Sequence, residues 1–228
     1  MSKIFDDFLG LFFPRRCVVC GDPVYLGSEL LCSTCINEMP KTNFHNDINN
    51  KTAQIFWGRV DLNFAASFLY FHKGSKYRHL IHLLKYNNMP DLGVYLGELY
   101  GADLLGTKAL QDACCIVPVP LHPKKRRIRG YNQSEEFSKG LSKVLGIETK
   151  DLLERKVFTE TQTQKSREER WLNVKDVFRA KDCREIEGKH VILTDDIVTT
   201  GATLEACVLA LQRCSDVKVS ILTIGIAQ

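Results

Sequence analysis

Residues 191–203 read V-I-L-T-D-D-I-V-T-T-G-A-T. The first four, Val191–Thr194, have the composition of a buried strand. An apolar face at helical spacing follows over residues 204–211, and Thr203 has the hydroxyl that is favoured at a helix N-cap. The stretch therefore predicts a strand, two adjacent carboxylates, a tight loop and a helix.

The loop has the chemistry of a phosphate site. Small residues after a buried strand let several backbone N–H groups converge on one anion, and the helix N-terminus adds partial positive charge. Gly201 supplies backbone freedom beside Ala202, while Thr199, Thr200 and Thr203 supply hydroxyl donors. We expect these five residues to bind a phosphate group.

Asp195 and Asp196 need a different partner, because like charges repel at short range. Two carboxylates beside a phosphate loop suit the paired hydroxyls of a ribose. The sequence thus predicts a site for a ribose that carries a 5-phosphate. The alternative is an ordinary strand, turn and helix with a capping Thr, which leaves the two aspartates without a role.

This stretch resembles the phosphoribosyl diphosphate (PRPP) motif of type I phosphoribosyltransferases. The resemblance implies that Asp195 and Asp196, the catalytic candidates, hold the ribose 2- and 3-hydroxyls. It also implies that residues 199–203 hold the 5-phosphate and that Mg²⁺ accompanies PRPP. Catalysis in such a site is mostly positioning and stabilisation of the departing diphosphate.

Positive charge is concentrated in one short segment. The chain of 228 residues has a formal net charge of only +4, and residues 124–129 carry five of its cations. They follow a predicted strand, Ala113–Val119, and a Pro-rich exit that contains His122. Ligands of parallel sheets bind beyond the carboxyl ends of strands, so we expect these cations beside Asp195. The candidates for binding diphosphate are Lys124, Arg126, Arg127 and Arg129. His122 is interpreted as structural or solvated, with contact to a ligand as the alternative.

Cys17-x-x-Cys20 and Cys32-x-x-Cys35 are separated by 11 residues. Two such pairs can place four sulfurs at tetrahedral corners, which suits a structural zinc ion. Disulfides are the less favoured alternative, because the chain has nine cysteines and no export signal. A redox pair would not need a matching second pair. The other cysteines (Cys114, Cys115, Cys183, Cys207 and Cys214) are interpreted as small buried or neutral residues.

Composition divides the chain into three parts. Residues 1–40 are predicted to hold an N-terminal helix and the zinc ribbon, 41–58 a polar linker, and 59–228 the main domain. The helix has an apolar stripe over residues 4–13, for which packing on the protein is favoured over membrane association. The stripe is too short to span a bilayer and has no cleavage site, so a cytoplasmic protein is expected.

Residues 60–70 alternate as a strand does, with a partner across a hairpin as one option, and apolar residues at helical spacing follow from 77 to 99. Lys85 ends the first helical face. It could reach a diphosphate, but a solvated lysine at a helix end is the favoured interpretation.

Residues 155–170 are long, polar and almost without apolar side chains. Such a segment inside a compact domain is typical of a lid, which would exclude water from a reactive ribosyl centre. Its candidate contacts are Gln164, Arg167 and Arg170. A solvated surface loop is the alternative.

The order of these features resembles the ComF family, which joins a double zinc ribbon to a type I phosphoribosyltransferase-like domain. The features are the four N-terminal cysteines, V-P-V-P-L-H-P with its basic run and G-Y-N-Q, T-Q-T-Q-K-S-R-E-E-R-W-L-N at 161–173, and the loop at 199–203. The resemblance implies an α/β fold, a parallel sheet with helices on both faces, and a small hood from residues 60–99. It also implies a link to natural competence and single-stranded DNA.

Three functions fit these features: a transferase that moves a phosphoribosyl group to an acceptor, a competence factor that binds single-stranded DNA, and a PRPP sensor without turnover. No Cys–His or Ser–His pair stands out as a nucleophile. The sequence gives no indication of the acceptor or of the oligomeric state.

Overall fold

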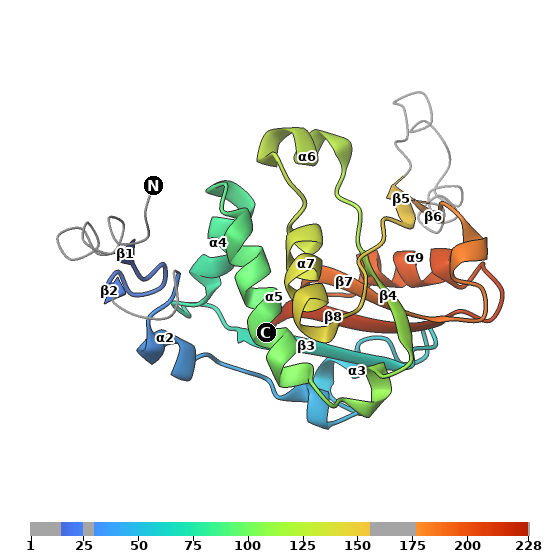
Figure 1. The fold of residues 1–228 in the computed structure, drawn as a ribbon, viewed down its shortest axis with the longest axis horizontal. Helices are drawn as coiled ribbons and strands as arrows, with labels where there is room; N and C mark the ends of the chain where they lie inside the picture. The colour runs from blue at the N-terminus through green and yellow to red at the C-terminus, as the bar shows by residue number, and fades with distance from the viewer. Residues whose placement is uncertain (1–14, 25–29, 156–176, 228) are drawn as a thin grey trace.

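The computed structural model describes residues 15–24, 30–155 and 177–227. Its centre is a sheet of four strands in the order β3-β8-β7-β4, and each neighbouring pair is parallel (Figure 1). The strands are β3 (Phe64–Phe71), β4 (Ala113–Pro118), β7 (His190–Val198) and β8 (Lys218–Ala227). The predicted α/β class with a parallel sheet is confirmed.

Helices cover both faces of this sheet. On one face α5 (Pro90–Leu104) and α7 (Gln133–Leu145) lie side by side (Figure 1). They approach closely because Gly97 faces Gly140, and a Cβ at Gly97 would lie 2.9 Å from the Gly140 Cα. Helix α9 (Ala202–Leu211) connects β7 to β8. In the order β3-β8-β7-β4, the chain moves from β7 back toward β3, whereas the connection that contains α5 moves from β3 toward β4. Both connections join parallel strands and are expected to be right-handed, so α9 lies on the face opposite to α5.

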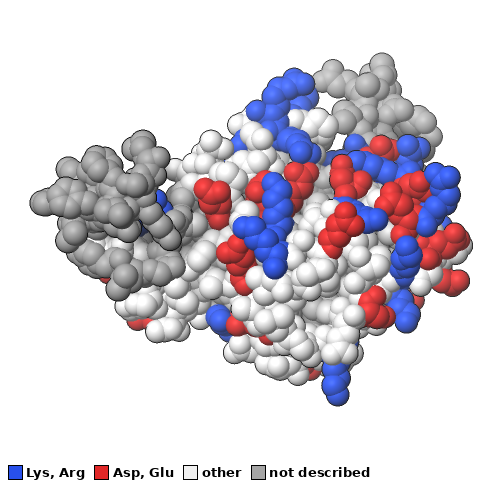
Figure 2. Space-filling view, viewed as in Figure 1, with Lys and Arg blue, Asp and Glu red and all other residues white. Residues whose placement is uncertain are grey.

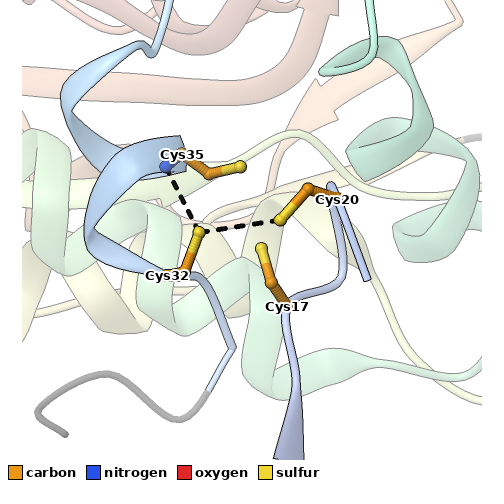
Figure 3. A group of neighbouring side chains, drawn as sticks. All are labelled: Cys17, Cys20, Cys32 and Cys35. Carbon is orange, nitrogen blue, oxygen red and sulfur yellow. Dashed lines mark hydrogen bonds between the residues drawn. The ribbon is translucent and has the colours of Figure 1, made fainter. Parts of the chain in front are cut away.

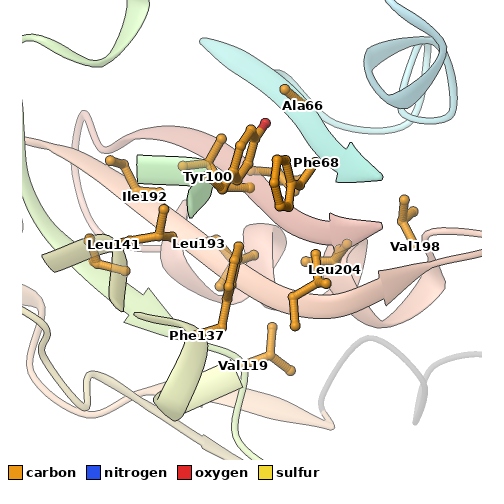
Figure 4. Packing of buried hydrophobic residues seen from close by; sticks show 14 of the residues in the cluster. Ala66, Phe68, Tyr100, Val119, Phe137, Leu141, Ile192, Leu193, Val198 and Leu204 are labelled. Carbon is orange, nitrogen blue, oxygen red and sulfur yellow. The ribbon is translucent and has the colours of Figure 1, made fainter. Parts of the chain in front are cut away.

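The core fills the space between the sheet and these helices. Strands β7 and β8 are almost wholly buried, as strands covered on both faces are. Phe68, Tyr100 and Phe137 stack in a column, with ring centroids 4.9 Å apart for the first pair and 6.3 Å for the second (Figure 4). The Tyr100 hydroxyl is the one buried side-chain polar atom without a hydrogen-bond partner among the described residues.

Residues 60–99 do not form a separate hood. β3 is an edge strand of the main sheet and pairs with β8 in parallel, not across a hairpin. α5 belongs to the layer that covers the sheet. Only α4 (Arg78–Tyr86) stands at the carboxyl edge, beside the C-terminus (Figure 1). The alternation over residues 60–70 correctly predicted a strand. Its partner strand, β8, lies at the other end of the chain and could not be predicted from local spacing.

Residues 41–58, predicted as a polar linker, are packed on the edge of the sheet. They include a 3-10 helix, η1 (Phe44–Asn46), and the helix α3 (Lys51–Gln54). Asn50 is 3% exposed, and its Nδ2 donates to the Ala65 carbonyl oxygen of β3 at 2.7 Å. The polar composition therefore reflects buried hydrogen bonds rather than a free connection. The boundaries at 40/41 and 58/59 stay predictions.

Short elements complete the described chain. Those of the N-terminal region are β1 (Arg15–Arg16), which pairs antiparallel with β2 (Pro23–Val24), and α2 (Ser33–Asn37). The others are η2 (Lys108–Leu110), α6 (Pro123–Arg129), η4 (Cys183–Glu185) and the antiparallel pair of β5 (Leu153–Arg155) with β6 (Phe178–Ala180).

Two cysteines differ from the prediction. Cys183 and Cys214, interpreted as unpaired small residues, form a disulfide that joins η4 to the turn after α9. They are 31 residues apart, so no local pattern signalled the pair. Cys114, Cys115 and Cys207 are free.

The predicted helix at residues 4–13 lies outside the described residues. Within the ranges that are described, no helix has both the length and the apolar character needed to cross a membrane.

Candidate functional site

The two aspartates stand at the carboxyl end of a central strand. β7 continues past the predicted end at Thr194 and includes Asp195 and Asp196, because β8 pairs with it as far as Val198. Helix α9 begins at Ala202, with Gly201 as its N-cap. Thr203 is therefore not the N-cap that the sequence predicted, and lies within the first helical turn. Strand, loop and helix otherwise follow in the predicted order.

The loop between β7 and α9 presents donors to one small cavity. A recess of about 50 Å³ is lined by Asp195, residues 197–203 and Leu204. Thr199 and Thr200 are exposed. Because α9 starts at Ala202, the N–H groups of its first turn have no carbonyl partner four residues earlier in the helix. The recess thus has the geometry of an anion site at a helix N-terminus.

Gly201 is needed both for its backbone and for its lack of a side chain. Its φ is +74°, and a Cβ there would lie 2.8 Å from Ile55 Cγ2 and 2.9 Å from Phe56 Cε1. The segment predicted as a linker therefore forms the wall behind the loop between β7 and α9. Arg59 holds the same wall: its Nη1 donates to the Thr200 carbonyl oxygen at 2.7 Å and to the Ile55 carbonyl oxygen at 3.0 Å.

Asp195 is partly buried between the sheet and the start of α7. Ser134 Oγ donates to Asp195 Oδ1 at 2.9 Å, from a position 61 residues earlier in the chain. Burial, and after it the neighbouring charge of Asp196, raise the pKa of Asp195 to about 7, although hydrogen bonds from the Asp196 backbone N–H and from Ser134 act in the opposite direction. The free site thus holds a carboxyl group that titrates near neutrality, a perturbation typical of functional sites.

Asp196 has a cation of its own. The Nζ atom of Lys85, in the last turn of α4, lies 2.9 Å from Asp196 Oδ2. The side chains of Lys85 and Asp196 are 25% and 15% exposed, respectively. The interpretation of Lys85 as a solvated lysine is therefore wrong, because the fold brings the end of α4 against the end of β7. Lys85 is a site residue that sequence reasoning set aside.

The G-Y-N-Q motif anchors α4 to α7. The Tyr131 hydroxyl donates to the Leu84 carbonyl oxygen at 2.5 Å, and Gln133 Nε2 donates to the same oxygen at 3.1 Å. Asn132 caps α7 by accepting from the Ser134 backbone N–H, and its Nδ2 donates to the Val119 carbonyl oxygen. The motif therefore positions Ser134 and Lys85 on either side of the acidic pair. The motif could be recognised in the sequence, but its contacts with Leu84 and Val119 could not be predicted from it.

The basic run that follows the Pro-rich exit forms a short helix, α6 (Figure 1). Arg126 pairs with Glu135 at 2.9 Å, and Arg129 Nη1 donates to Gln133 Oε1. Lys124 and Arg127 are exposed, and no α6 residue is buried. Figure 2 shows a group of Lys and Arg side chains at the top, where Figure 1 places α6, whereas acidic and basic side chains are interspersed on the surface below. Of the four diphosphate candidates, Arg126 and Arg129 thus bind their own chain.

His122 has a structural role. Its Nδ1 accepts from the Lys124 backbone N–H at 3.2 Å at the start of α6. Burial lowers the pKa of His122, and the cations of Arg155, Lys124 and Lys125 lower it further. A neutral ring is the form that can accept this hydrogen bond, so the direction of the shift favours the contact.

The lid candidates Gln164, Arg167 and Arg170 lie outside the described residues. Arg155, before that segment, is the last residue of β5, and Val177, after it, directly precedes β6. The pair of β5 and β6 contacts α9.

Four cysteines come together in the N-terminal region, as predicted. The Sγ atoms of Cys17, Cys20, Cys32 and Cys35 all lie within 4.8 Å of one another (Figure 3). The Cys35 backbone N–H donates to Cys32 Sγ at 3.4 Å. Burial opposes ionisation of Cys17, but backbone N–H groups outweigh it and lower its pKa to about 6. The cluster is compatible with zinc and consistent with a zinc ribbon.

Comparisons with known proteins agree with this arrangement. The phosphoribosyl transferase domain family matches residues 132–224. DNA utilization protein YhgH of Escherichia coli (strain K12) is 33% identical over 129 residues, which cover 55% of this chain and 56% of YhgH. The match thus spans little more than half of that relative. Competence protein F of Haemophilus influenzae is 29% identical over 203 residues, which cover 85% of this chain and 89% of that protein.

Two solved structures are also similar to part of the chain. One is the structure of the allosteric regulatory enzyme of purine biosynthesis, with 23% identity and a TM-score of 0.40. The match covers 57% of this chain and 25% of the chain in that structure. The other is glutamine PRPP amidotransferase from B. subtilis, with 22% identity and a TM-score of 0.38. That match covers 59% of this chain and 26% of the amidotransferase chain. The chain thus has a phosphoribosyl transferase domain, homology to competence protein F and YhgH, and a cluster of four cysteines, and together these support its resemblance to the ComF family.

Proposed function

We propose that this protein binds PRPP at the carboxyl end of β7 and transfers its phosphoribosyl group to an acceptor. One observation carries the proposal: Asp195 and Asp196 directly precede a recess built from exposed threonines and the N-terminus of α9. The carboxylates suit ribose hydroxyls, and the recess suits the 5-phosphate.

The reaction needs one bond to break and one to form at ribose C1. The C1–O bond to diphosphate breaks and its electron pair leaves with the diphosphate. A nucleophile of the acceptor bonds to C1 and loses its proton to solvent or to a nearby base. Lys85 lies beside the acidic pair and is placed to offset charge there. Mg²⁺, held mainly by ligand oxygens and water, would neutralise charge on the diphosphate.

The cysteine cluster would hold a structural zinc ion. Its four donors are thiols, and the segment from residue 15 to 38 has little apolar volume of its own, so a metal would supply stability that burial does not. Cys17, Cys20, Cys32 and Cys35 are the proposed ligands.

The biological setting that we propose is the uptake or use of DNA in the cytoplasm. The names of two relatives support it, one a competence protein and the other a DNA utilization protein. Single-stranded DNA and the competence machinery are the proposed partners. The exposed α6 favours direct contact with DNA, since Lys124, Lys125 and Arg127 are exposed.

Calorimetry with PRPP and Mg²⁺ tests the binding step. We expect heat of binding for the wild-type protein and at least a tenfold loss of affinity in Asp195→Asn and Asp196→Asn. Asp61→Asn, at an exposed position away from the recess, serves as the control. No heat with metal-replete, folded protein would contradict the proposal.

Release of diphosphate from PRPP, measured with nucleobases, amines and DNA fragments in turn, tests the transfer step. Release that depends on one acceptor class identifies a transferase. Binding without release in the whole series would instead support a PRPP sensor.

A further inference from the structure

A larger cavity adjoins the proposed PRPP site. It has a volume of about 920 Å³ and lies between α4 and the carboxyl ends of β3, β7 and β8. Ile197 and Thr199 form part of its lining, so it shares a wall with the phosphate loop. Lys85, the partner of Asp196, belongs to its lining as well. A ligand here would therefore lie next to a ribose bound at the acidic pair.

One wall of the cavity is a row of aromatic rings on the exposed face of α4. The His79 and His82 rings are nearly parallel, with centroids 6.0 Å apart, and the His82 and Tyr86 rings are 4.9 Å apart. Tyr86 is 69% exposed, although large apolar side chains are normally covered. The Arg129 guanidinium lies 5.7 Å from the Tyr86 ring centroid and so closes the end of the row. Such a row offers flat faces on which another ring can stack.

The cavity is also basic. Lys73 and Arg78 contribute to its lining together with Lys85, and none of its described lining residues is acidic. Lys85 is paired with Asp196, but no ion pair is formed by Lys73 or Arg78 within the described parts of the chain. Unpaired cations beside aromatic rings suit a ligand with a flat ring and a phosphate group. The volume is sufficient for a ligand of that size.

We propose that this cavity binds a nucleotide, with the base against His79, His82 and Tyr86 and the phosphate toward Lys73 and Arg78. The proposal rests on the proposed function, in which the nucleotide would be the acceptor. The simpler explanation is that this face of α4 is only solvated, and that would account for the exposed histidines. It does not account for a basic cavity that opens beside the acidic pair.

Calorimetry with AMP and with a short oligothymidylate tests the proposal on the full, metal-replete chain. We expect at least one of the two to bind. The double variant His82→Ala, Tyr86→Ala should lower its affinity at least tenfold, and Arg78→Gln should lower it several-fold and weaken its dependence on salt. Tyr86→Phe, which keeps the ring, should retain most of the affinity. His45→Ala, at a histidine in a different cavity, is the matched control.

The two ligands distinguish the sources of the nucleotide. Binding of AMP identifies a free nucleotide, whereas binding of the oligothymidylate alone identifies a strand of which the cavity holds one unit. Both support the proposal. It is overturned if neither ligand binds, if the variants bind like the wild type, or if ribose 5-phosphate displaces the nucleotide from the site. PRPP binding is measured on the same samples, so that the nucleotide proposal and the proposed PRPP function are tested separately. If the protein binds PRPP but no nucleotide, only the proposal for this cavity is refuted.

Discussion

The ammonium group of Lys85 and the carboxylate of Asp196 are 2.9 Å apart and join the end of α4 to the end of β7. The other end of α4 adjoins the cysteine cluster, where the Tyr77 hydroxyl donates to the Cys35 carbonyl oxygen at 2.8 Å. One helix of nine residues therefore connects the proposed metal centre to the acidic pair. It also carries the aromatic wall of the basic cavity.

Lys85→Met tests whether this ion pair supports PRPP binding. Without Lys85, two adjacent carboxylates lose their nearest cation, so we expect PRPP affinity to fall about tenfold, or about 1.4 kcal/mol. Calorimetry measures the change. Lys143→Met is the matched control, because Lys143 forms an ion pair of the same length with Glu98 on the surface. Equal effects of the two substitutions would show that the position of Lys85 has no special importance.

Gly201→Ala tests the wall behind the loop between β7 and α9. A Cβ at this position meets Ile55 and Phe56 at less than 3.0 Å, and φ is +74°. Gly188→Ala is the control, since its φ is +68° and nothing lies within 4 Å of the added Cβ. We expect the control to cost about 1–2 kcal/mol for the left-handed backbone and Gly201→Ala to cost about 1–3 kcal/mol more from overpacking. Denaturant unfolding measures both, and equal losses would contradict the packing argument.

Asp195→Asn tests the buried carboxyl group through the pH dependence of stability. The pKa of Asp195 is raised from 3.8 to about 7, so the folded state binds the proton more tightly than the unfolded state does. The stability contributed by this group is present below pH 4 and is lost as the pH rises through 7. Asn does not titrate. We therefore expect Asp195→Asn to be more stable than the wild type at pH 8, on the order of 1–3 kcal/mol, and to lose that advantage at pH 4.

Thermal unfolding at the two pH values, without PRPP, makes this comparison. Asp61→Asn, at an exposed carboxylate, should give the same difference from the wild type at both. A gain for Asp195→Asn that does not change with pH would mean that burial of charge is not its cause.

Removal of the metal tests the connection through α4. We expect a chelator to release zinc, to lower the melting temperature and to weaken PRPP binding, because the cysteine cluster anchors the start of α4 through Tyr77. Zinc content, thermal unfolding and calorimetry on the same sample measure the three effects. Cys20→Ser should reproduce them, whereas Cys114→Ser, at an exposed free cysteine outside the cluster, should not. Loss of zinc with unchanged PRPP affinity would show that the two sites are independent.

The sequence by itself determined the features that are contiguous in the chain. The run of apolar residues, two aspartates and a small-residue loop sufficed to predict the strand, the tight loop and the helix, since each depends on neighbours a few positions away. The two Cys-x-x-Cys pairs likewise predicted a cluster that the fold brings together. Local spacing carries this information because backbone period, turn chemistry and ligand geometry act over short distances.

Only the tertiary structure decided which distant residues complete the site. Ser134 reaches Asp195 across 61 positions, and Arg59 reaches Glu205 across 146. Lys85 was interpreted as solvated and residues 41–58 as a linker because each depends on contacts with a strand or loop elsewhere in the chain. A parallel sheet sets such contacts by strand order, and the order β3-β8-β7-β4 is not written in any single stretch of residues.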